Sequence, residues 1–145
     1  MATWVHEIEG RESDDIMRVL TALSEFVKAS AGLQTRYGLP APFTFGAGIN
    51  TGLATVGNAG TGDLTEYTAL GDAVNAAFRI EASTRETGVD LALGETTCSY
   101  IRNRQDAEQY FEQRTVQLKG YDQPATVWAT SFDRINALLK LPAQR

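Results

Sequence analysis

The sequence predicts a single α/β domain in which helices flank a mixed β-sheet. Helix-like and strand-like patterns alternate along the chain, and this order favours a sandwich over a doubly wound sheet. Short β-branched and aromatic runs are bounded by Gly and Pro. At 145 residues, of which 43% are hydrophobic, the chain is long enough for one real core.

The first half begins with an apolar segment at residues 2–5, which we interpret as the end of a strand. A helix is predicted over 13–30, with Ser13-Asp14-Asp15 as its cap and Gly32 as its stop. Its apolar positions recur at steps of three and four residues and are Ile16, Val19, Leu20, Leu23, Phe26 and Val27.

Pro40 and Pro42 delimit the following loop. Two strands are predicted next, over 43–50 and 53–56. The second half then begins with a helix from Asp72 to about residue 85, in which Asp72 is the expected N-cap, and Gly88 ends this helix.

The rest of the chain completes the alternation. Residues 89–93 form a buried strand and residues 95–103 a helix in this prediction. Residues 114–118 and 126–131 are expected to form a strand pair around the turn at 119–124.

Composition excludes several classes of protein. The formal net charge of −5 and the absence of a Lys/Arg run argue against a nucleic-acid surface. No apolar stretch approaches the roughly 20 residues that cross a bilayer, so we expect no membrane contact from this segment. The start of the chain lacks the features of a signal peptide. The single Cys98 excludes an internal disulfide and suits a reducing cytosol, so a cytoplasmic location is predicted.

Glycine is concentrated in one segment. Seven of the thirteen glycines lie between Gly46 and Gly71. They alternate with β-branched and polar residues rather than with the Ser, Pro and Gln of a flexible linker. Because glycine permits positive φ and close approach of the backbone to a ligand or another chain, we interpret this segment as an ordered loop system that carries a site.

Four motifs in this order resemble a known family. They are Gly48-Ile49-Asn50-Thr51-Gly52, Val56-Gly57-Asn58-Ala59-Gly60, the run from Tyr67 to Arg79 (YTALGDAVNAAFR), and Leu118-Lys119-Gly120. Together they resemble the C-terminal half of a class III adenylyl/guanylyl cyclase catalytic domain, over about residues 43–130. The resemblance implies a ferredoxin-like sandwich with a mixed, mostly antiparallel sheet. Residues 1–145 would then be a single cyclase domain, truncated at its N-terminus.

Arg79 and Asn75 match the family's catalytic residues. The resemblance implies that Arg79 stabilises the transition state at phosphate and that Asn75 orients the ribose. A guanidinium group suits bidentate phosphate binding, and the four-residue spacing places both side chains on one helix face. The alternative is a solvated surface helix on which Arg79 pairs with Glu81 or Asp72.

Thr68 and Lys119 match the substrate-binding positions of the family. The resemblance implies that Thr68 reads the purine edge and that Lys119 binds phosphate. Adenylyl cyclases carry Asp or Thr at the position of Thr68, so the resemblance implies ATP as the substrate. GTP is the other possible substrate, because a Thr hydroxyl group can either donate or accept a hydrogen bond. The alternatives are an ordinary β-branched strand residue and a turn lysine in solvent.

No metal ligand is predicted in this chain, although the resemblance implies Mg²⁺ or Mn²⁺ in a complete domain. The family holds two ions on two upstream aspartates, and Met1-Ala2-Thr3-Trp4 resembles the strand that follows the second of them. Asp14, Asp15 and Asp63 do not occupy matching positions. His6 lacks partners at a metal-ligand spacing, and Asp72 is interpreted as a helix cap.

Family sites form across a two-fold dimer interface, to which one subunit brings the metal carboxylates and the other the Asn, Arg and base reader. The partner of this chain is therefore a second copy or a complete cyclase domain. A homodimer would lack metal carboxylates, so we expect this chain alone to be inactive. Gly57, Gly60 and Gly62 would shape an arm that reaches over the partner, or alternatively a simple hairpin.

Two residues depart from the family pattern. Gly46 stands where many members have arginine, and Phe78 where the residue is usually small. The leading hypothesis is an adenylyl cyclase-type domain that converts ATP to cyclic AMP and pyrophosphate. A non-catalytic regulatory or dimerisation module is the alternative, and a ferredoxin-like binding domain without ATP affinity is a third.

Overall fold

The structure is a computed structural model that describes residues 1–5, 8–61, 64–102, 104 and 107–140. Its main sheet has four strands in the order β1-β4-β6-β5. β1 (Ala47–Ile49) is parallel to β4 (Leu91–Gly94). β6 (Ala125–Thr130) is antiparallel to both β4 and β5 (Glu112–Val116). This arrangement confirms the mixed, mostly antiparallel sheet that the sequence predicted.

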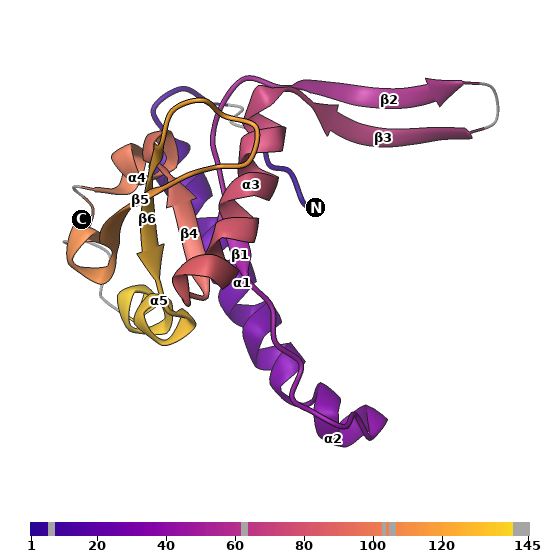
Figure 1. Ribbon diagram of the computed structural model, residues 1–145, viewed down its shortest axis with the longest axis vertical. Helices are drawn as coiled ribbons and strands as arrows, with labels where there is room; N and C mark the ends of the chain where they lie inside the picture. The colour runs from indigo at the N-terminus through magenta and orange to yellow at the C-terminus, as the bar shows by residue number, and fades with distance from the viewer. Residues whose placement is uncertain (6–7, 62–63, 103, 105–106, 141–145) are drawn as a thin grey trace.

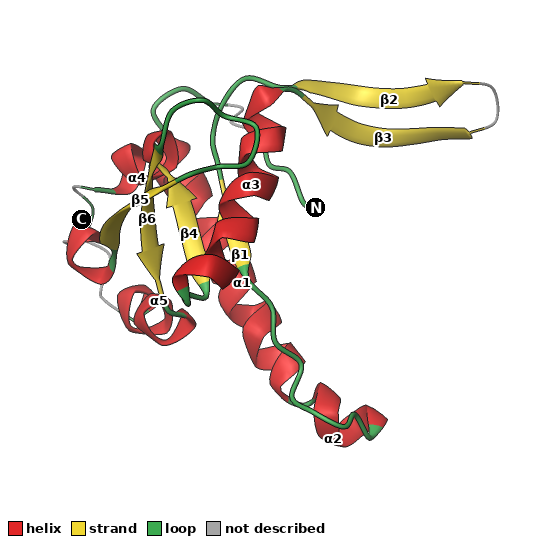
Figure 2. Cartoon of the chain, in the orientation of Figure 1, coloured by secondary structure: helices red, strands yellow, loops and turns green. Residues whose placement is uncertain are grey.

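Helices lie on both faces of this sheet, as Figures 1 and 2 show. α3 (Asp72–Thr87) covers one face. The other face is covered by α1 (Glu12–Ala31), α4 (Glu95–Ile101) and α5 (Phe132–Leu139). A short α2 (Leu33–Tyr37) and a 3₁₀ turn, Ala107–Tyr110, complete the helical elements.

Alternation along the strands divides the core into two clusters. On β4, Leu91 and Leu93 pack with Ile16, Leu20 and Ile135 on one side. Ala92 faces the other side and packs near Ile80 of α3. Because successive strand residues point to opposite faces, one buried strand supports both helical layers.

A two-stranded antiparallel hairpin, β2 (Thr55–Thr61) and β3 (Leu64–Leu70), projects from this body (Figure 1). The strand predicted at 53–56 begins at residue 55 in the structure and extends to residue 61. The hairpin has the shape expected of an arm. Gly62 and Asp63 at its tip lie outside the described residues.

The prediction that Ser13-Asp14-Asp15 caps the first helix was wrong. The N-cap position is Arg11, and no side chain bonds to this helix end. Asp14 is instead paired with Arg104, and the same guanidinium group donates to Ser13 Oγ at 3.3 Å. The polar start of α1 therefore joins it to the segment after α4. The predicted stop at Gly32 is confirmed.

The predicted strand at 43–50 is shorter in the structure, since only residues 47–49 pair with β4. Phe43 and Phe45 precede the paired residues, and Phe45 packs between Phe26 and Phe132 with ring centroids 5.0 Å from each. Residues 2–5 are not in a strand, contrary to prediction. His6, and Asn103 at the predicted end of α4, lie outside the described residues.

Within the described part of the chain, no helix is both long enough and apolar enough to cross a membrane.

Candidate functional site

The strand β1 lies in close contact with α3, which carries the two predicted catalytic residues. A Cβ atom on Gly48 would lie 2.6 Å from the carbonyl oxygen of Ala77, and one on Gly52 would lie 2.7 Å from Ala73 Cβ. The side-chain amide of Asn50 also donates a hydrogen bond to the carbonyl oxygen of Ala73, with 2.9 Å between Nδ2 and the oxygen. These glycines therefore position the helix, whereas the sequence suggested that they approach a ligand or another chain.

The junction between the hairpin and α3 depends on Gly71. This residue is the N-cap of α3 and has φ of +150°, in the region that favours glycine. Its missing Cβ would lie 3.2 Å from the Leu53 carbonyl oxygen. Asp72 is thus not the N-cap, which corrects the sequence prediction. Thr68 is half-buried, lies opposite Gly57 on the hairpin and precedes Gly71 by three residues in the chain.

Asn75 and Arg79 lie on the exposed side of α3, whereas Ile80, Ser83 and Thr84 form its buried side. The structure thus places the two predicted catalytic residues on one accessible helix face. Among the described residues, the Arg79 guanidinium has no hydrogen-bond or ion-pair partner. Glu81 pairs with Arg85 at 2.9 Å, so it does not neutralise Arg79.

Lys119 lies in a tight turn that the residues before and after it hold in place. The amide of Tyr121 donates to the Leu118 carbonyl oxygen at 3.1 Å, and Gly120 has φ of +86°, which suits glycine at the third position of such a turn. Leu118 is buried in the cluster that contains Ile80 of α3. Lys119 itself is exposed.

A hydrogen bond connects this turn to α3. The Tyr121 hydroxyl group donates to Asp72 Oδ1 at 2.9 Å. The bond to the Asp72 carboxylate raises the pKa of Tyr121, and the nearby positive charge of Arg79 partly opposes this shift. No pattern in the sequence singled out Tyr121. Its only signal was its position directly after Leu118-Lys119-Gly120.

The described residues do not offer a metal site of their own. No three His, Cys, Asp or Glu side chains lie together among them. Asp72 is bonded to Tyr121, and the ion pair with Arg104 holds the pKa of Asp14 below its ordinary value. His6 and Asp63 lie outside the described part of the chain.

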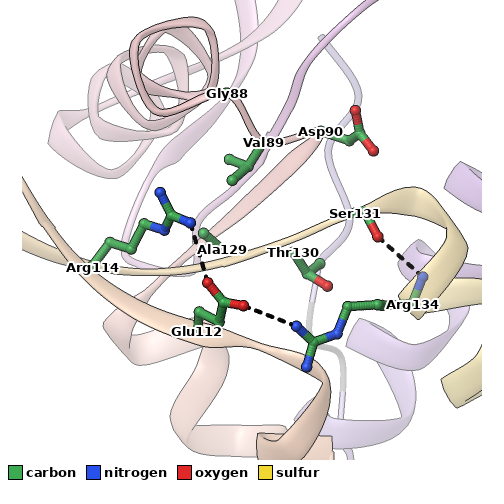
Figure 3. Close-up of a pocket in the computed structure, with 9 residues that line it drawn as sticks. All are labelled: Gly88, Val89, Asp90, Glu112, Arg114, Ala129, Thr130, Ser131 and Arg134. Atoms are coloured by element: carbon green, nitrogen blue, oxygen red, sulfur yellow. Dashed lines mark hydrogen bonds and ion pairs between the residues drawn. The ribbon is translucent and has the colours of Figure 1, made fainter.

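A cavity of about 230 Å³ lies at the opposite end of α3. Figure 3 shows Glu112 there between the side chains of Arg114 and Arg134. Glu112 Oε2 lies 3.1 Å from Arg114 Nη2, and Glu112 Oε1 lies 3.2 Å from Arg134 Nη1. α3 has 16 residues and is about 24 Å long, so this cavity is well separated from the first turns of the helix. None of the predicted site residues lines it.

The two departures from the family pattern have different surroundings. At Gly46, a Cβ atom would collide with the Thr84 hydroxyl group, so an arginine there would require Thr84 to change its side-chain conformation or α3 to shift. Phe78 is about half exposed and lies beside Arg79 on the outer side of the helix. Its bulk therefore faces outwards and does not disturb the core.

No family model matches this sequence. Adenylate cyclase 1 of Rhizobium meliloti (strain 1021) is 36% identical over 81 residues, which are 56% of this chain and 12% of that protein. An adenylate cyclase of Anabaena cylindrica is 30% identical over 110 residues, 74% of this chain and 21% of the relative. The chain thus spans a small part of the length of these relatives.

Solved structures are similar in fold. The guanylyl cyclase Cya2 aligns with a TM-score of 0.62 at 28% identity, over 81% of this chain and 58% of its own. The adenylyl cyclase CyaB from P. aeruginosa also has a TM-score of 0.62, at 24% identity, over 86% of this chain and 62% of its own. The first is named for a guanylyl substrate and the second for an adenylyl substrate, so the likeness does not decide the purine.

Proposed function

Because this chain contains a class III adenylyl/guanylyl cyclase-type domain, we propose that it supplies the nucleotide-orienting half of an adenylyl cyclase site. The complete site would convert ATP into 3′,5′-cyclic AMP and pyrophosphate, as part of cytoplasmic signalling. The names of the curated relatives favour ATP. GTP is the alternative substrate.

One observation carries this proposal. Arg79 has no hydrogen-bond or ion-pair partner among the described residues and shares the exposed side of α3 with Asn75, and the Lys119 turn is hydrogen-bonded to the first turn of the same helix. Two groups that suit a nucleoside triphosphate therefore lie on one helix, and the turn that carries the third is hydrogen-bonded to the same helix. A helix that only faced solvent would not require a hydrogen bond that holds a separate turn next to its arginine.

In the proposed reaction, the ribose 3′-oxygen attacks the α-phosphorus and pyrophosphate leaves. Negative charge grows on the phosphoryl oxygens, and the Arg79 guanidinium would stabilise it with paired N–H donors. Asn75, one turn earlier, would hold the ribose. Lys119 would bind the departing phosphates, and Thr68 would hydrogen-bond the purine edge from the hairpin.

We infer that the metal ions of the complete site are held by residues outside the described part of this chain. Mg²⁺ or Mn²⁺ would activate the nucleophile and neutralise phosphate charge in the complete site. The described residues provide no group of carboxylates for this role. We therefore propose that a partner domain contributes the metal carboxylates, and that this chain alone, even as a homodimer, is inactive.

A non-catalytic regulatory or dimerisation module is the second candidate. It is favoured by the hairpin, because Leu53, Tyr67 and Leu70 expose large apolar surfaces at or near it. Such a surface suits a partner subunit. Nucleotide binding distinguishes the two candidates, since a pure dimerisation module has no need of free phosphate-binding groups.

Hydrogen exchange of the purified chain with and without ATP tests the proposal. We expect ATP to slow exchange at residues 68–79 and 117–121. The cavity residues 88–90 and 112–114 serve as an internal control and should not respond. Protection confined to the cavity, or none at millimolar ATP, would contradict the proposed site.

A further inference from the structure

The hydrogen bond between Tyr121 and Asp72 involves a carboxylate that lies within reach of Arg79 on the same helix. Asp72 and Arg79 are seven residues apart, so their side chains leave α3 in nearly the same direction, about 10 Å apart along its axis. Helical side chains tilt towards the N-terminus, and a long arginine at the later position therefore extends towards the earlier aspartate. Asp72 is thus a potential partner for Arg79.

The same protein contains such a pair. Glu95 and Arg102 are also seven residues apart along α4, with the acid first, and Arg102 Nη2 lies 2.9 Å from Glu95 Oε1. A carboxylate and an arginine at this spacing can therefore meet in a helical segment of this chain. On α3 no such pair is present among the described residues, and the Asp72 carboxylate instead accepts a hydrogen bond from the Tyr121 hydroxyl group.

We propose that Tyr121 is a positioning residue: its hydroxyl group occupies Asp72, which holds the Lys119 turn against α3 and leaves the Arg79 guanidinium free for phosphate. This inference rests on the proposed function, in which Arg79 and Lys119 bind the phosphates. The second carboxylate near Arg79, Glu81, is occupied by Arg85. Asp72 and Glu81 thus both have other partners.

Two features of Tyr121, the packing of its ring and the hydrogen bond of its backbone, support this role. Its ring packs against the cluster of Ile80, Val116 and Leu118, which anchors it independently of the hydroxyl group. The backbone of the same residue closes the Lys119 turn. Tyr121→Phe should therefore retain the fold and the turn while it releases Asp72.

Chemical modification of Arg79 measures this release without a nucleotide. Phenylglyoxal reacts with accessible guanidinium groups, and mass spectrometry can follow each arginine separately. In the wild-type chain, Arg79 should react faster than the ion-paired Arg85. Tyr121→Phe should slow the reaction at Arg79 about two- to fivefold, the range for an exposed ion pair. The double variant Tyr121→Phe/Asp72→Asn should restore the wild-type rate.

Two results would overturn the inference. Either Tyr121→Phe leaves the Arg79 rate unchanged, or the double variant reacts as slowly as the single one. Tyr37→Phe, on the distant α2, is the matched control and should behave as wild type. ATP affinity, measured on the same variants, separates this inference from the proposed function. If the wild-type chain does not bind ATP, the proposed function fails, whereas the modification rates still decide the role of Tyr121.

Discussion

At the scale of single residues, Arg79 is the group on which the proposed chemistry depends. The four-residue spacing predicted that it shares a helix face with Asn75, and the structure places both on the exposed side of α3. The sequence left open whether Arg79 pairs with Glu81 or Asp72. The partner of Asp72 could not be predicted, because Tyr121 is 49 residues away in the chain.

Arg79→Ala should abolish most catalysis while it leaves the fold intact. In a complemented site, we expect kcat to fall about 10²- to 10³-fold, as when one preorganised donor to the transition state is removed. Arg79→Lys should recover little of this loss, because an ammonium group does not offer the paired donors. Steady-state cyclic AMP kinetics measure both effects. A fully active Arg79→Ala variant would refute the assignment.

Cys98 illustrates a buried residue without a chemical role. It is 1% exposed, and burial raises the pKa of its thiol to about 11. At pH 8 almost no thiolate forms, so the native chain should not react with a disulfide reagent such as DTNB within minutes. The unfolded chain in guanidinium chloride should react fully. Rapid stoichiometric reaction of the native chain would show that this part of the core is open.

At the scale of elements, periodicity predicted the long helices and failed at the short elements. The pattern from Ile16 onwards placed α1 well, and Gly88 marked the end of α3, where it has φ of +67°. α5 was missed, although Ser131 caps it by accepting from the Arg134 amide at 3.4 Å. β1 was predicted too long, because sequence does not show how many of its residues find a partner strand.

The close packing of β1 and α3 gives a stability prediction. Gly48→Ala places a methyl group against the backbone of Ala77 and Glu81, so it should lower the free energy of unfolding by about 1–3 kcal/mol. Gly57→Ala is the matched control, because no atom lies within 4 Å of its added Cβ. Urea unfolding measures both variants. Equal stability of the two would show that α3 does not need this glycine.

At the scale of the whole molecule, the projecting hairpin and its base expose an apolar surface. Leu53 is 97% exposed and Tyr67 75%, and Leu70 and Phe78 are each more than half exposed. Where exposed apolar side chains form one patch, they commonly mark a protein interface. The predicted pairing with a second cyclase domain would cover this surface.

Sedimentation velocity tests this interface. We expect the chain to self-associate at micromolar concentration through the hairpin, and Tyr67→Asp to shift it towards the monomer. Tyr37→Asp changes a comparably exposed tyrosine on α2 and should leave the association unchanged. Equal dissociation by both variants, or a wild-type chain that is monomeric at every concentration, would contradict an interface on the hairpin.

The central claim is that this chain supplies the arginine half of a cyclase site. The direct test mixes it with the catalytic domain of the Rhizobium meliloti relative, in which the counterpart of Arg79 is replaced by alanine, and measures cyclic AMP formed from ATP and Mn²⁺. We predict product only in the mixture, and none when this chain carries Arg79→Ala. A mixture that forms a complex but yields no product, or yields it equally without Arg79, would contradict the claim.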